Sequence, residues 1–148
     1  MGRAGVLVLV SVVAAAFVAA GHATRDANSL TVRLHQWNRS GVGGTMVVTP
    51  VRDGVAFVLK LQLPTRLKRS VLLAHVNRTT CAGYARLRTE QERGKTLEFP
   101  LAYVVKGSTR GTLPAKLRRL RDGNHSVEVG LAGGTKYGVV ACGDFPRR

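Results

Sequence analysis

Residues 72–83 read LLAHVNRTTCAG and combine a short apolar run around His75 with Cys81, the first of only two cysteines in the 148-residue chain. The second, Cys142, lies in the segment VVACGD at residues 139–144. Two cysteines in an exported chain predict a disulfide, and only one bridge is available within the chain. That bridge would join positions 61 apart, a loop for which the chain-entropy estimate is roughly 4 kcal/mol of stability. Free thiols or a bridge between two chains are the alternatives.

The beginning of the chain has the pattern of a secretory signal peptide. Arg3 precedes an apolar run from Ala4 to Ala20 that only Ser11 interrupts, and small residues follow. A basic start, an apolar core and a small-residue cleavage site are typical of export signals. We therefore expect a secreted, extracellular or periplasmic protein, with a signal peptide at 1–23, a linker at 24–28 and one domain at 29–148. Retention of the apolar run as an N-terminal membrane anchor is the alternative.

The rest of the chain contains short segments in which apolar and polar residues alternate, the pattern of half-buried strands. The clearest of them places Val55, Phe57, Leu59, Leu61 and Leu63 on one face. By this criterion, strands are expected at 30–35, 43–49, 55–63, 71–77, 96–105, 125–130 and 137–142. Short strands separated by glycine-containing and Asp-Gly turns predict an antiparallel sandwich or barrel of about seven or eight strands.

Three segments do not alternate in this way. Residues 78–94 lack periodicity and are expected to form a surface loop held by the disulfide, and residues 106–111 to form a turn. The segment near 114–121 is the one expected helix, because Leu117 and Leu120 share a face opposite several basic residues. The fold class predicted from these patterns is therefore all-β, with at most one short helical segment.

Several motifs, taken in order, resemble the secreted Cu/Zn superoxide dismutase family. Ala74-His75-Val76-Asn77 is similar to the family's His-Val-His strand, and Cys81 follows it as the family's first disulfide cysteine does. Val140-Ala141-Cys142-Gly143 is similar to the Leu-Ala-Cys-Gly segment that carries the second. The resemblance spans residues 29–145 and is shared with metal-poor bacterial relatives. It implies a Greek-key β-sandwich stapled by Cys81 and Cys142.

The resemblance also implies where a copper site would lie, and most of its ligands are missing. His75 matches the first copper histidine, but Asn77 takes the place of the second, and Gly130 falls near the position of the last. Residues 82–95, which should supply zinc ligands, contain neither His nor Asp. Val139 replaces the arginine that guides superoxide in the family. His75 is therefore the one candidate metal ligand that survives.

The histidine count gives the same expectation independently of the resemblance. Beyond the expected signal peptide, the chain holds only His35, His75 and His125. A redox copper ion needs several imidazoles within about 2 Å of the metal. His35 alternates onto the polar face of its strand, and His125 begins a strand after a turn. We therefore expect no catalytic residues and no competent metal site, with weak copper or zinc binding at His75 as the alternative.

The formal net charge of +15 favours anionic partners. The best candidate for a polyanion-binding patch is formed by Lys116, Arg118, Arg119 and Arg121, which could extend through Arg66, Lys68 and Arg69. This patch lacks the interleaved aromatic residues on which single-stranded nucleic acids stack, so nucleic acid is not an expected partner. An anionic cell-surface polymer fits better, and a membrane is expected as a partner only if the signal segment is retained. Charge that merely keeps strands soluble is the alternative.

Together these observations predict an extracellular or cell-envelope domain that is not an enzyme and has a binding or structural role with an unidentified partner. A weak or vestigial copper- or zinc-binding superoxide dismutase and a polyanion-binding surface protein are the two alternatives.

Overall fold

The structure is a computed structural model that describes residues 28–132 and 138–147. The expected signal peptide at 1–23 lies outside the described residues, as does nearly all of the expected linker. Export, cleavage and localisation therefore stay predictions.

Eight antiparallel strands dominate the described residues, which confirms the predicted all-β class. They are β1 (Leu30–Gln36), β2 (Gly43–Val51), β3 (Gly54–Gln62), β4 (Leu72–Asn77), β5 (Leu97–Val104), β6 (Ser108–Leu113), β7 (Ser126–Leu131) and β8 (Val139–Asp144).

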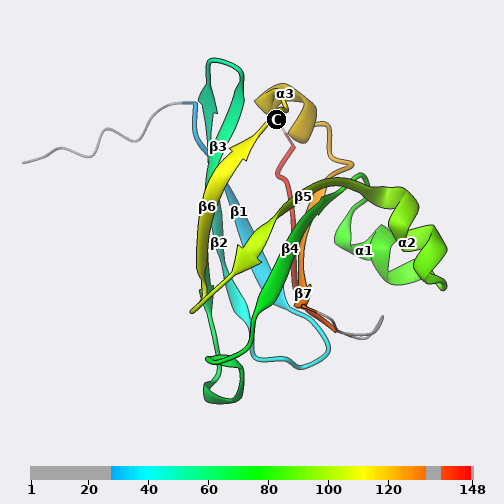
Figure 1. The fold of residues 1–148 in the computed structure, drawn as a ribbon. Coiled ribbons are helices and arrows are strands. Elements are labelled where there is room, and N and C mark those ends of the chain that lie inside the picture. The colour runs from blue at the N-terminus through cyan, green and yellow to red at the C-terminus, as the bar shows by residue number, and fades with distance from the viewer. Residues whose placement is uncertain (1–27, 133–137, 148) are drawn as a thin grey trace, which may run out of the picture.

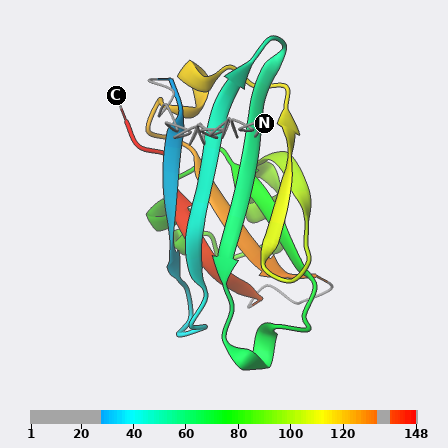
Figure 2. The ribbon, with the colours of Figure 1, turned by 90° about the vertical axis from the view of Figure 1, so that its left-hand side faces the viewer.

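The strands form a nearly closed barrel in the order β5-β4-β7-β8-β1-β2-β3-β6. One half contains β1, β2, β3 and β6, which lie side by side in Figure 2, and the other contains β5, β4, β7 and β8. The chain leaves the first half after β3, forms the β4–β5 pair in the second half, and returns to place β6 beside β3. This crossing is a Greek-key connection. His35 and Gln36 of β1 pair with β8 and join the halves on one side.

The core lies between the two halves, and period-two alternation builds it. In β1, Leu30, Val32 and Leu34 are buried, whereas the residues between them face solvent. Met46, Leu59 and other apolar side chains of the first half meet those of β4, β7 and β8 in one cluster. The apolar face that the sequence predicted for residues 55–63 is therefore the core face of β3.

The prediction of a turn at 106–111 was wrong, because β6 begins at Ser108. The turn is only two residues long. Lys106 and Gly107 both have positive φ, 53° and 77°, and Val105 bridges to Ser108 across them. Two consecutive positive φ angles are the geometry of a tight primed hairpin turn, in which glycine is favoured. Pairing with β3 extends the polar segment Ser108–Leu113 even though it contains a glycine.

The prediction of a surface loop at 78–94 was also wrong. This region forms two short helices, α1 (Cys81–Arg86) and α2 (Glu90–Thr96), which lie on the outer side of the β4 half (Figure 1). Thr80 caps α1 by accepting a hydrogen bond from the Gly83 N–H. Thr89 and Glu92 form a reciprocal capping box at α2. Caps of this kind stabilise helices too short to show a periodic apolar face.

Two further helical turns complete the described fold. A 3₁₀ turn, η1 (Thr65–Leu67), follows β3, and α3 (Leu117–Leu120) follows β6. The expected helix near 114–121 is thus present but shorter, because the extended backbone of Lys116 places the start of α3 at Leu117. The expectation of at most one helical segment was wrong in number. Among the described residues, no helix is long and apolar enough to cross a membrane.

Candidate functional site

The disulfide predicted between Cys81 and Cys142 is confirmed, with the two Cα atoms 6.0 Å apart. It joins the first residue of α1 to the middle of β8. The Cys81 N–H also donates a 2.6 Å hydrogen bond to the Asp144 carboxylate. Together these contacts hold α1 against the outer face of the second half of the barrel. The outward side chains of β4 and β7 in this region therefore face protein rather than open solvent.

His75 lies in a row of paired residues that runs across this face. Its Cα partner on β7 is Glu128, whose partner on β8 is Cys142. His75, Asn77 and Glu128 line one side of a small hollow of about 160 Å³. Residues of α1, α2 and β5 line its other side, namely Tyr84, Arg93, Gly94 and Leu97. This hollow, which we call the His75 pocket, is the candidate site.

Glu128 is the central acceptor of the His75 pocket. It is only 7% exposed, and its Oε2 accepts a 3.1 Å hydrogen bond from the Asn77 side-chain N–H. The Tyr84 hydroxyl donates a second hydrogen bond to this carboxylate. Burial raises the pKa of Tyr84 well above its ordinary range, and the negative charge of Glu128 raises it further. A buried carboxylate is stable when such donors surround it.

Arg93 covers the other side of Tyr84. Its guanidinium lies 5.6 Å from the centre of the Tyr84 ring, within the range of a cation–π contact. It also donates a 3.0 Å hydrogen bond to the Leu87 carbonyl. Arg93 therefore links α2 to the end of α1 and fixes the wall of the pocket.

His75 retains unused hydrogen-bonding capacity in this pocket. Its Nδ1 is buried and has no hydrogen-bond partner among the described residues. Glu128, the residue paired with His75 on β7, already accepts hydrogen bonds from Asn77 and Tyr84. Asn77 occupies the position where the resemblance implies a second imidazole. The pocket thus offers one imidazole beside a carboxylate that other donors already satisfy.

The structure keeps the three histidines apart. His35 is paired with Cys142, three strands away from His75, which places their Cα atoms about 14 Å apart at ordinary strand spacing. Both ring nitrogens of His125 face carboxylates, Nδ1 at 2.8 Å from Asp122 and Nε2 at 2.5 Å from Glu98. No three His, Cys, Asp or Glu side chains within 28–132 and 138–147 are grouped to hold a metal ion. These residues do not fit the copper site that the resemblance implies.

A second polar cluster surrounds Glu98 of β5 and was not found from the sequence. The Glu98 side chain is 5% exposed and forms an ion pair with Arg119 of α3. It also contacts His125 before β7 and, at 3.5 Å, Arg78 after β4. Because an imidazolium can donate from both nitrogens, a charged His125 would satisfy Glu98 and Asp122 together. The sequence signal was Glu98 itself, a carboxylate within an otherwise apolar strand.

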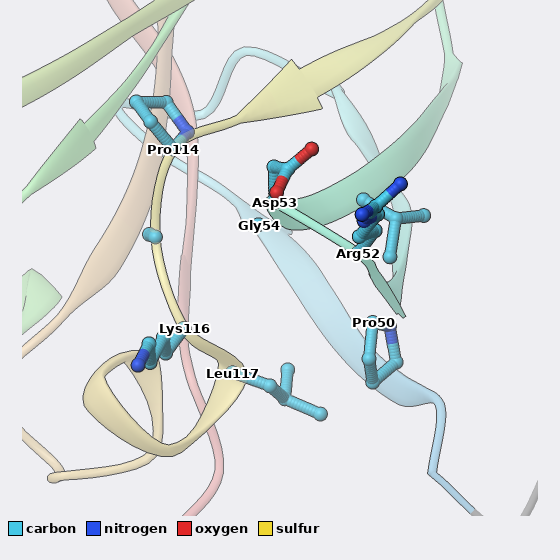
Figure 3. Close-up of a pocket in the computed structure, with 9 residues that line it drawn as sticks. Pro50, Arg52, Asp53, Gly54, Pro114, Lys116 and Leu117 are labelled. Carbon is cyan, nitrogen blue, oxygen red and sulfur yellow. The ribbon is translucent and has the colours of Figure 1, made fainter.

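The predicted basic patch is only partly available as a binding surface. Arg119 is engaged with Glu98, whereas Lys116, Arg118 and Arg121 have no ion-pair partner in the described part of the chain. Lys116 and Leu117 face the β2–β3 turn across a hollow of about 580 Å³, in which Arg52 and Asp53 lie opposite (Figure 3). The hollow is therefore lined by one cation from each of two separate segments, together with Asp53.

The suggested extension of this patch through Arg66, Lys68 and Arg69 was wrong. β6 ends at Leu113, which pairs with Val55 near the start of β3. α3 follows β6 and therefore lies at this end of the sheet. Residues 66–69 follow the opposite end of β3, after Gln62. The nine residues of β3 separate the two groups by about 30 Å.

Comparison of the chain with models of known protein families, with curated proteins and with solved structures found no significant match. The resemblance to the superoxide dismutase family therefore depends on the sequence motifs around His75, Cys81 and Cys142 alone.

Proposed function

We propose that this chain is an exported extracellular or cell-envelope domain that keeps a superoxide-dismutase-like frame, lacks the dismutase metal chemistry, and serves a binding or structural role. The observation that carries the proposal is the composition of the His75 pocket. Where the resemblance implies a set of copper-binding imidazoles, Asn77 and Tyr84 donate to a buried Glu128. A network that satisfies its own carboxylate stabilises the fold, but it leaves few donors for a metal.

The frame of the domain supports the same proposal. The resemblance implied a Greek-key arrangement with a bridge between Cys81 and Cys142, and the described residues have both features. Fold alone does not imply function, so the composition of the His75 pocket carries the proposal. In this proposal the disulfide and α1 hold the outer face together, and the partner binds elsewhere on the surface.

The test is metal content and superoxide removal, measured together on protein isolated from an oxidising compartment. We expect copper and zinc well below one ion per chain, and no superoxide removal above that of buffer. The matched control is His75→Ala, which should have the same metal content as the wild type. Copper at one ion per chain that is lost in His75→Ala, together with superoxide removal, would support the weak-dismutase alternative and overturn the proposal.

Polyanion binding is the second candidate function, and the unpaired cations beside α3 favour it. Lys116 lines one hollow with Arg52 and Asp53, and Arg118 and Arg121 follow in and directly after α3, so one extended polyanion could contact several cations. Retention on immobilised heparin should fall when these three residues are changed to Gln, with Arg119 left in place for its ion pair. The matched control removes three exposed cations of the sheet face, Arg33, Lys60 and Arg110. Equal loss of retention in both variants would indicate non-specific charge and count against a patch at α3.

A further inference from the structure

The end of the barrel opposite α3 is positively charged, and its described residues include no acidic side chain. The described residues at this end are 37–42, 63–71, 105–107 and 131–132, none of which is Asp or Glu. They carry five exposed cations, Arg39, Arg66, Lys68, Arg69 and Lys106. We call these residues, together with the apolar side chains described below, the basic loop end. Within the described residues, these cations form no ion pairs.

Direct contacts hold these connections side by side. The Arg66 guanidinium donates a 2.5 Å hydrogen bond to the Ser40 carbonyl and so ties the β3–β4 connection to the β1–β2 turn. The Leu61 N–H donates to the Gly107 carbonyl at 2.7 Å, which fixes the β5–β6 turn against β3. Lys68 and Lys106 then line one hollow of about 450 Å³ with Leu61 and Leu63. Figure 2 shows the connections at this same end of the barrel.

Exposed apolar side chains lie among these cations. Tyr103 is 64% exposed, Val105 55%, Val71 45% and Leu131 37%. Tyr103 and Val105 flank the buried Val104 on β5, and Val71 precedes Leu72, the partner of Val104, so these three lie at the same corner of the sheet. Leu131 ends the next strand, where it pairs with Leu72. Single exposed apolar residues are common on protein surfaces, but a group of them beside cations indicates an interaction site.

We infer that the basic loop end docks on the surface of a bilayer that contains anionic phospholipid. Lys and Arg bind lipid phosphates, while Tyr and aliphatic side chains enter the boundary between headgroups and acyl chains. The exposed apolar side chains favour a lipid surface over a soluble anionic polymer, which would need only the charges. The inference goes beyond the proposed function and does not depend on what the His75 pocket binds.

The single tryptophan of the chain provides a local measurement of this docking. Trp37 lies in the β1–β2 turn, which Arg66 ties to the rest of the basic loop end. Brominated phosphatidylcholine quenches tryptophan fluorescence only on close contact. Comparing vesicles with and without phosphatidylglycerol separates this docking from insertion of the N-terminal apolar segment, which does not require anionic lipid, so the full chain can be used.

The experiment adds the full chain to brominated phosphatidylcholine vesicles with and without phosphatidylglycerol. We expect Trp37 quenching only with phosphatidylglycerol, and less of it as salt is raised. Changing Lys68 and Lys106 to Gln should weaken binding about 25-fold, since each cation near an anionic surface contributes about fivefold. The matched control, Lys116→Gln with Arg118→Gln at the opposite end, should bind like the wild type.

A second pair of variants separates lipid from polymer. Tyr103→Ser with Val105→Ser should weaken vesicle binding and leave heparin retention unchanged, and circular dichroism should verify that all variants are folded. The inference is overturned if phosphatidylglycerol vesicles do not quench Trp37, or if the control at α3 weakens binding as much as the Lys68 and Lys106 variant. Vesicle binding that persists without the apolar side chains and is abolished by soluble heparin would assign this end to a polymer instead.

Discussion

His75 lies directly opposite Glu128 in the ladder between β4 and β7, yet the Glu128 carboxylate accepts its hydrogen bonds from Asn77 and Tyr84. This arrangement differs from that of a metal centre, in which imidazoles and carboxylates converge on an ion. Apart from His75, whose Nδ1 has no partner among the described residues, the polar groups here satisfy one another beneath α1. Their measurable effects should therefore be on stability and on proton binding.

Tyr84 should ionise only at a pH well above its ordinary pKa of 10.0, because burial and the charge of Glu128 both disfavour the phenolate. Because folding raises the pKa of Tyr84, the stability that its protonated form contributes is fully present below pH 10. This contribution falls as the pH rises further. An absorbance titration of the phenolate band should show a late step that is absent in Tyr84→Phe. Glu128→Gln should move that step to lower pH, because the negative charge that raises the Tyr84 pKa is removed while burial and the charge of Arg93 remain. A late step that survives in Tyr84→Phe would contradict the assignment.

Asp122 should contribute to the loss of stability in acid. Burial opposes its ionisation, but the hydrogen bonds from the Asn124 N–H and from His125 outweigh this effect, so its pKa lies below the ordinary 3.8. A carboxyl group whose pKa is lowered by folding stabilises the protein at pH values above its pKa in the unfolded chain. This stability is lost as the pH falls through its pKa in the folded protein. In urea unfolding, Asp122→Asn should be less stable than the wild type near neutrality, and the difference should vanish in strong acid. A difference that is independent of pH would exclude this linkage.

Glu98→Gln should destabilise the domain by about 3–5 kcal/mol, because the buried His125 and the Arg119 guanidinium lose the carboxylate that compensates them. The measurement is the free energy of unfolding from a urea titration. The exposed Glu90 offers a matched control, and Glu90→Gln should shift the midpoint little. If both variants unfold at the wild-type midpoint, the Glu98 cluster has no role in stability.

Replacing Cys81 and Cys142 together by Ser should cost roughly 4 kcal/mol, since the bridge closes a loop of 61 positions in the unfolded chain. Reducing the wild type should lower its unfolding free energy to that of the double variant. Reductant that leaves the wild-type midpoint unchanged would show that the bridge is not formed in solution.

The fold was predictable where one physical signal dominated. Alternation along residues 55–63 identified β3, since one of its faces is buried and the other is not. The count of two cysteines sufficed for the bridge. β6 was missed because its pairing with β3, rather than its own composition, makes it extended. α1 and α2 were missed because they are short and are stabilised by caps at Thr80 and Thr89 rather than by a periodic apolar face.

The candidate site was harder to predict because strand register decides it. His75 was found from its motif, but Glu128 becomes its neighbour only through the pairing of β4 with β7. Tyr84 reaches the carboxylate only because the disulfide holds α1 over that face. Local spacing in one chain contains neither relationship. The sequence could thus name a lone histidine but could not show that its neighbours already satisfy each other.

The most direct test of the proposed loss of metal chemistry is an electron paramagnetic resonance titration with copper(II). Our account predicts that added copper gives only the signal of weakly bound ion, without resolved coupling to several imidazole nitrogens, and that His75→Ala gives the same spectrum. A stoichiometric copper signal with coupling to several nitrogens, lost in His75→Ala, would contradict it.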